Sequence, residues 1–203
     1  MIAASEALGR LLEGNRRFVA RRSASTPDDH ADRRAGLVDG QEPFAIVLGC
    51  SDSRVPVELI FDQGFGNLFV IRVAGNIVAP SQVGSVEFAA SKFGTKLVVV
   101  MGHSQCGAIL SAVEEVLDGS TNESRNLRSI VDRVRPAVES VMGGRSDLDR
   151  PTLIEQAVRA NVRASVDHLR HGSELLERLI QQDGLVIVGA HYSLDTGVVT
   201  FLD

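Results

Sequence analysis

The chain has 203 residues, of which 44% are hydrophobic and 23% are charged, a composition that suits one soluble α/β domain with a sizeable core. Its formal net charge of −5 argues against a nucleic acid or an anionic membrane as partner. No apolar run is long enough to cross a bilayer, and the start lacks the layout of a signal peptide. We therefore expect a cytoplasmic protein whose two cysteines are reduced.

Apolar runs alternate with helical patterns along the chain, which predicts a single domain over residues 1–203 with a mostly parallel central sheet, one antiparallel edge strand and flanking helices. An amphipathic helix is expected at 3–21, within an N-terminal arm of residues 1–22, followed by a polar connection at 22–42. The core, residues 43–118, and the C-terminal part, residues 124–203, hold the other elements. The predicted strands are 44–50, 68–72, 96–102, 185–190 and 198–202, and the predicted helices are 82–93, 106–117, 124–142, 151–170 and 174–182.

The only two cysteines stand in two short polar motifs, Cys50-Ser51-Asp52-Ser53-Arg54 and His103-Ser104-Gln105-Cys106. Two thiolates and one imidazole make a three-ligand zinc set, which leaves the fourth position open for water or substrate. Cys50 and His103 both follow the carboxyl end of a predicted parallel strand, the edge where open α/β sheets place their sites. Cys106 is expected at the start of a helix, where the helix dipole favours a thiolate.

The residues after Cys50 supply the chemistry that such a zinc site needs. Thiolate ligands push electron density onto the metal, so the bound water is harder to deprotonate than in a site with three histidines. Asp52 can accept a hydrogen bond from that water, and Arg54 can hold the carboxylate in place and keep it ionised. We therefore predict Asp52 and Arg54 as a catalytic pair.

Other interpretations of these motifs stay open from the residues alone. The two cysteines could form a disulfide or be inert buried thiols, although His103 would then have no explanation. Asp52 could act as a fourth ligand in a closed resting state of the zinc site. Arg72, at the end of a predicted strand, is expected to form a structural ion pair.

The motifs resemble those of the β-class carbonic anhydrases, and the resemblance covers nearly the whole chain. It rests on five segments: 14–18, Cys50-Ser51-Asp52-Ser53-Arg54-Val55-Pro56, 69–76, Gly102-His103-Ser104-Gln105-Cys106-Gly107-Ala108 and 189–197. It implies zinc-dependent hydration of carbon dioxide to bicarbonate and a proton by zinc-bound hydroxide, with one Zn²⁺ per subunit. The implied roles are zinc ligands for Cys50, His103 and Cys106, a catalytic dyad for Asp52 and Arg54, and substrate binding for Gln41, Phe69, Ala74, Phe88 and Gly107.

The resemblance also implies self-association and leaves rival functions. Members form homodimers, often paired into homotetramers, and the arm helix is expected to pack on a partner subunit. In some members the carboxylate corresponding to Asp52 leaves its arginine and closes the zinc site. One rival is a carbon disulfide or carbonyl sulfide hydrolase on the same fold. The other is a non-catalytic zinc or redox-sensing module.

Overall fold

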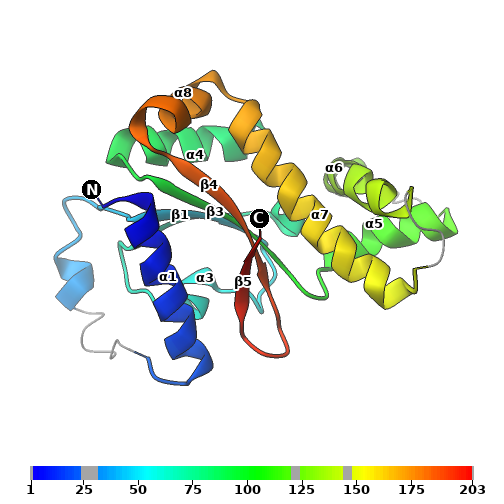
Figure 1. Cartoon of the computed structure of the whole chain (residues 1–203), viewed down its shortest axis with the longest axis horizontal. Helices are drawn as coiled ribbons and strands as arrows, with labels where there is room; N and C mark the ends of the chain where they lie inside the picture. Colours follow the sequence, from blue (N-terminus) through cyan, green and yellow to red (C-terminus); the bar gives the residue numbers. More distant parts are fainter. Residues whose placement is uncertain (1, 24–31, 120–123, 144–147, 203) are drawn as a thin grey trace.

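The computed structural model describes residues 2–23, 32–119, 124–143 and 148–202. Their strands form one five-stranded sheet in the order β2-β1-β3-β4-β5 (Figure 1). Strands β1 to β4 run parallel, and only the edge pair of β4 and β5 is antiparallel. The predicted fold class is confirmed. The strands are β1 (Ala45–Gly49), β2 (Leu68–Arg72), β3 (Leu97–His103), β4 (Val186–Tyr192) and β5 (Val199–Leu202).

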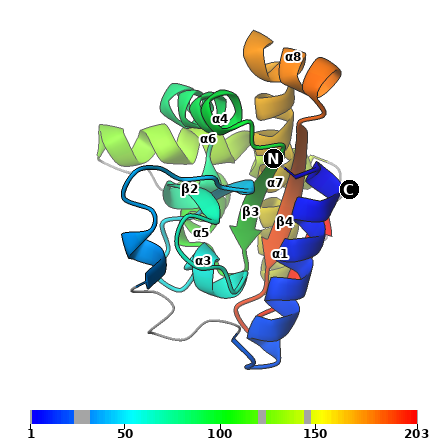
Figure 2. The same ribbon diagram turned by 90° about the vertical axis from the view of Figure 1, so that its left-hand side faces the viewer.

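Helices cover both faces of this sheet (Figures 1 and 2). Helices α1 and α3 contribute to the hydrophobic core on one face, whereas α4, α7 and α8 contribute to the core on the other. A third cluster joins α5, α6 and α7 beside the carboxyl ends of the strands. The helices are α1 (Ala4–Val19), α3 (Val57–Ile60), the 3₁₀ turn η1 (Ala74–Asn76), α4 (Pro80–Phe93), α5 (Gly107–Asp118), α6 (Arg125–Met142), α7 (Arg150–His171) and α8 (Glu174–Asp183).

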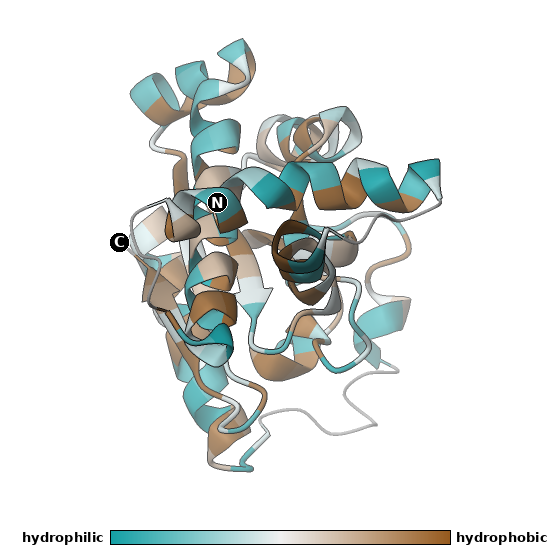
Figure 3. Cartoon of the chain, turned by 90° about the vertical axis from the view of Figure 1, so that its right-hand side faces the viewer, coloured by the Kyte–Doolittle hydropathy of each residue, from teal (hydrophilic) through white to brown (hydrophobic). Residues whose placement is uncertain are grey.

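The sequence explains why these elements form. Every residue of β1 and of β3 is buried, as expected of central parallel strands covered on both faces. The helices carry both hydrophilic and hydrophobic turns (Figure 3), which is the pattern of helices with one face in the core. Helix α7 ends at Gly172, and Ser173 begins α8 by accepting a hydrogen bond from the Leu176 N–H, as the sequence predicts.

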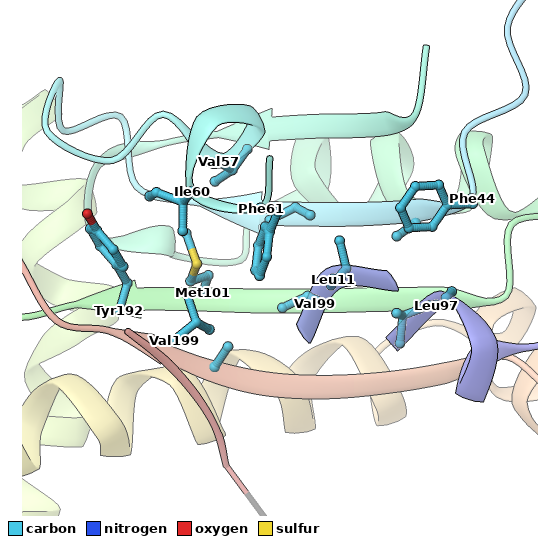
Figure 4. Packing of buried hydrophobic residues seen from close by; sticks show 14 of the residues in the cluster. Leu11, Phe44, Val57, Ile60, Phe61, Leu97, Val99, Met101, Tyr192 and Val199 are labelled. Carbon is cyan, nitrogen blue, oxygen red and sulfur yellow. The ribbon is translucent and has the colours of Figure 1, made fainter. Parts of the chain in front are cut away.

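Part of the apolar face of the arm helix is buried within its own chain, and the packing of this helix on a partner subunit stays a prediction. Leu11 is 0% exposed and lies in the core of its own chain, near Phe61 and Val99 (Figure 4). A Cβ on Gly14 would lie 1.8 Å from the Phe61 carbonyl oxygen, so the helix needs glycine at this close approach. The Asn15 amide donates to the Ile60 and Gly197 carbonyls. An amphipathic pattern shows that a face is buried, but not which chain buries it.

Two shorter features differ from the sequence-based expectations. The connection predicted at 22–42 contains a helical turn at 32–35, and its residues 24–31 lie outside the described part of the chain. The four-residue helix α3, directly after the first cysteine motif, was not predicted. Within the described ranges, no helix is both long enough and apolar enough to span a membrane.

Candidate metal centre

Two neighbouring strands and one helix bring the three proposed ligands together. Strand β1 pairs with β3 in parallel, with Gly49 opposite Met101. Cys50 therefore follows β1 at the same edge of the sheet where His103 ends β3, and Cys106 is the N-cap of α5. The two Sγ atoms and a ring nitrogen of His103 all lie within 4.8 Å of one another. The placement predicted from strand ends and a helix start is the placement in the structure.

The donor set fits a tetrahedral zinc ion. The sulfur atoms of Cys50 and Cys106 are 4.0 Å apart, close to the spacing of about 3.8 Å that Zn–S bonds of about 2.3 Å produce in a tetrahedron. A disulfide needs about 2.05 Å, and both cysteines are free thiols. The Nδ1 atom of His103 lies 2.9 Å from the Ser104 carbonyl oxygen, so it carries the ring proton. The buried Nε2 atom has no hydrogen-bond partner among the described residues, and its lone pair is left for a metal.

The sulfur atoms of Cys50 and Cys106 are in hydrogen-bond contact. This contact lowers the pKa of the Cys50 thiol below its usual range, against the opposing effect of burial. The neighbouring Cys50 thiolate, together with burial, raises the pKa of Cys106 above its usual range. A cation bound between the sulfurs removes this competition because a coordinating thiol is deprotonated. The pair is therefore suited to bind a positive ion.

The predicted catalytic pair is formed beside these ligands. Arg54 donates from Nε to Asp52 Oδ1 at 2.9 Å and from a terminal nitrogen to Oδ2 at 2.6 Å. These bonds hold the pKa of Asp52 well below its usual range, and they raise the pKa of Arg54. Asp52 Oδ2 also lies 3.9 Å from His103 Nε2. An ionised carboxylate thus stands next to the ligands while bound to its arginine, and closure of the site by Asp52 stays a prediction.

Arg72 has a role that the sequence did not indicate. An ion pair was expected, but its guanidinium donates to the main-chain carbonyls of Cys50 at 2.9 Å and of Asp52 at 2.6 Å. Arg72 therefore fixes the loop that carries both the proposed ligand Cys50 and the carboxylate of Asp52. The only sequence signal was a charged residue ending an apolar strand, and that signal does not specify its acceptors.

The predicted substrate-binding residues fall into two groups. Ala74 begins the turn whose next residue, Gly75, donates to Cys50 Sγ, and Gly107 begins α5 directly after Cys106. The remaining three residues lie away from the ligands of their own chain. Phe69 pairs with Ile46, four residues before Cys50, or about 13 Å along the strand. Gln41 precedes the start of β1. Phe88 is 53% exposed on α4 and contacts Phe69, with ring centroids 6.1 Å apart.

A family model described as carbonic anhydrase matches residues 45–199. This range covers most of the chain and includes both cysteine motifs. The chain belongs to the β class of the carbonic anhydrase family. Carbonic anhydrase 2 of Mycobacterium tuberculosis is 41% identical over 193 residues, which cover 95% of this chain and 90% of that protein. The carbonic anhydrase of Mycolicibacterium smegmatis is 36% identical and covers 93% and 88%.

A solved structure supports the same family. The β-carbonic anhydrase CafA of Aspergillus fumigatus has a TM-score of 0.78 and 26% sequence identity, covering 98% of this chain and 90% of that one. The chain is accordingly an enzyme of the carbonic anhydrase type. The family is metal-dependent, and Cys50, His103 and Cys106 form a group able to bind a metal.

Proposed function

We propose that this enzyme uses zinc to interconvert carbon dioxide and bicarbonate. The observation that carries the proposal is the convergence of Cys50, His103 and Cys106 beside the ionised Asp52. These ligands would hold one Zn²⁺ per chain, which supplies a nucleophilic oxygen at neutral pH and leaves one position open. The cytoplasmic location expected from the sequence stays a prediction.

Asp52 orients the attacking oxygen. Arg54 occupies both carboxylate oxygens from one side, so the carboxylate stays ionised and keeps one fixed direction. From that position it accepts a hydrogen bond from water and directs the lone pair of the water oxygen toward carbon dioxide. Arg54 also donates to the Gln105 carbonyl at 3.1 Å, and this contact ties the carboxylate to the loop that carries Cys106. The pair therefore connects the two ligand motifs as well as serving the reaction.

Backbone groups at the start of α5 complete the part of the site that one chain provides. The first N–H groups of a helix have no partner within the helix. Those of Ala108 and Ile109 donate to the Cys106 sulfur, and we assign the Gly107 N–H to a substrate oxygen. We also assign Ala74 to the substrate pocket as apolar surface, since it begins the turn that contacts Cys50.

The second group of substrate-binding residues points to self-association. Gln41 and Phe69 lie toward the amino ends of the strands, and Phe88 is exposed, so these residues do not reach the ligands of their own chain. Phe65, at 51% exposed, and Leu59, at 62%, are further exposed hydrophobic residues of the single chain. We propose that Gln41, Phe69 and Phe88 serve the site of a second copy of this chain, in a homodimer or a dimer of dimers.

The test is carbon dioxide hydration by the full chain loaded with zinc, measured by stopped flow at neutral and mildly alkaline pH. We expect one zinc per chain and rapid hydration. A preparation that carries its zinc but shows no hydration contradicts the proposal. The same preparation is assayed with carbonyl sulfide and carbon disulfide, and faster turnover of either would replace carbon dioxide as the substrate.

A further inference from the structure

The sulfur of Cys50 accepts hydrogen bonds from two backbone N–H groups. These donors are Asp52 and Gly75, each with its nitrogen 3.4 Å from Sγ. The Asp52 donor belongs to the loop that follows the cysteine, whereas Gly75 comes from η1, the turn after strand β2. Hydrogen bonds to a ligand thiolate fix its direction and draw electron density away from the metal. The position of the Gly75 N–H therefore affects how Cys50 binds a metal.

The turn that carries Gly75 has an unusual backbone. Gly75 has φ +70° and the next residue, Asn76, has φ +44°. A left-handed conformation is uncommon for a residue with a side chain, and it persists only where the surroundings hold it. A Cβ on Gly75 would lie 3.0 Å from the Ala108 Cβ and 3.5 Å from a Val134 methyl group. The turn is thus confined between α5 and α6, and glycine and asparagine are residue types that adopt its left-handed conformation most readily.

Helix α7 supplies the polar contacts that hold this turn. The Asn161 Nδ2 atom donates to the Gly75 carbonyl at 2.8 Å, and the Ser165 hydroxyl donates to the Asn76 carbonyl at 3.2 Å. Both side chains are buried, and Asn161 is 2% exposed. Asn161 and Ser165 are one helical turn apart on the face of α7 toward the turn. An unpaired buried amide is costly, so this pairing strongly constrains the Gly75 carbonyl and, through the φ and ψ angles of Gly75, the N–H of the same residue.

We propose that Asn161 is a positioning residue for the metal centre. It holds the Gly75 carbonyl, and the N–H of the same residue then stays directed at Cys50 Sγ. Asn161 itself touches neither the ligands nor the substrate, so its effect passes through η1. Ser165 fixes the following peptide and has a smaller effect on Cys50. This proposal rests on the metal centre proposed above.

The test compares metal binding by the full-length apoprotein and its variants, with Co²⁺ as the probe. Cobalt bound to thiolates gives charge-transfer absorption that reports the metal–sulfur bond. We expect Asn161→Ala to weaken Co²⁺ binding by roughly ten- to hundred-fold, the range for residues that orient metal ligands, and to shift the charge-transfer band. Asn161→Ser is a milder variant with the same expected direction, and it serves if Asn161→Ala does not fold.

The matched control is Asn15→Ala. Asn15 is also a buried asparagine that donates to main-chain carbonyls, those of Ile60 and Gly197, but on the opposite face of the sheet. We expect it to lower thermal stability while leaving Co²⁺ affinity and the cobalt spectrum unchanged. If the Asn161 variants bind Co²⁺ as the unsubstituted protein does, or change only as much as Asn15→Ala, the positioning role is wrong. If the unsubstituted protein binds neither Co²⁺ nor Zn²⁺, the metal centre and the positioning role both fail.

Discussion

The two ends of the parallel sheet differ in what one chain can build. At the carboxyl ends of β1 and β3, Cys50, His103 and Cys106 meet, and the Asp52–Arg54 pair stands beside them. Toward the amino ends, Gln41 and Phe69 have no such neighbours among the ligands of the same chain. The parallel register of β1 and β3 brings Cys50 and His103 to one edge, and the start of α5 adds Cys106. The family resemblance assigns Gln41 and Phe69 to the active site, but their own chain does not place them beside its metal ligands.

The metal ligands and the catalytic pair therefore depend on one chain, whereas the proposed substrate pocket needs two. Ligand and dyad geometry depends on contacts within one chain, such as those of Arg72 to the Cys50 and Asp52 carbonyls. The proposed pocket depends on a second copy. A substitution at the carboxyl end should therefore impair the site of the chain that carries it. A substitution at the amino end should impair the site of the partner chain.

The largest effect is expected from Cys50→Ser, which removes a ligand at the end built by one chain. A serine hydroxyl stays protonated and does not replace a thiolate as a zinc ligand. We expect the chain to lose its zinc and hydration to fall to the rate of buffer alone, a change larger than the roughly 100-fold seen for residues that only orient ligands. Metal analysis and stopped-flow hydration measure the two effects. Ser51→Ala, at the next position, is the control and should keep both zinc and activity.

Asp52→Asn should separate catalysis from metal binding at the same end. The amide keeps the shape of the side chain but cannot accept the proton of water as a carboxylate does. We expect full zinc content and a fall in the hydration rate of about a thousand-fold, within the range for general acid–base groups. Unchanged hydration with zinc retained would show that the carboxylate is not used. An unchanged rate together with lower thermal stability would show that Asp52 contributes only to the stability of the site.

Gln41→Ala tests the amino end of the sheet. Gln41 is exposed in the single chain, so the substitution should leave stability unchanged. If its amide holds a substrate oxygen, we expect hydration to fall roughly 100-fold, as for loss of one preorganised donor. This result alone does not show which chain's site is served.

Mixing two inactive chains decides that question. A chain with Cys50→Ser keeps its Gln41, and a chain with Gln41→Ala keeps its metal ligands. In a mixed dimer of the proposed kind, one site of the two has both parts intact. Random pairing should then restore about a quarter of the unsubstituted activity. No recovery on co-expression, with mixed dimers demonstrated by differently tagged chains, would place Gln41 at the site of its own chain or at none.

Local patterns were enough to predict the sheet and the ligand placement. Continuous apolar runs predicted β1 and β3 because both faces of these strands are covered, and the ligands follow their ends directly. Helix α3 is too short for a helical period to be recognised. Asn161 was missed because its acceptor at Gly75 lies 86 positions away, and nothing near Asn161 in the sequence marks that contact. Arg72 was missed for the same reason, since its acceptors are main-chain carbonyls.

Leu11→Ala is expected to have the smallest effect on activity. It tests whether helix α1 is packed within its own chain. Leu11 is fully buried against its own core (Figure 4), so its truncation should lower the free energy of unfolding by about 3 kcal/mol. Because the contact is within one chain, the loss measured by urea denaturation should not depend on protein concentration. Leu12→Ala is the matched control, since Leu12 is 36% exposed, and we expect a loss below about 1 kcal/mol. A loss from Leu11→Ala that appears only as dissociation of subunits would place the helix on a partner, as the resemblance implied.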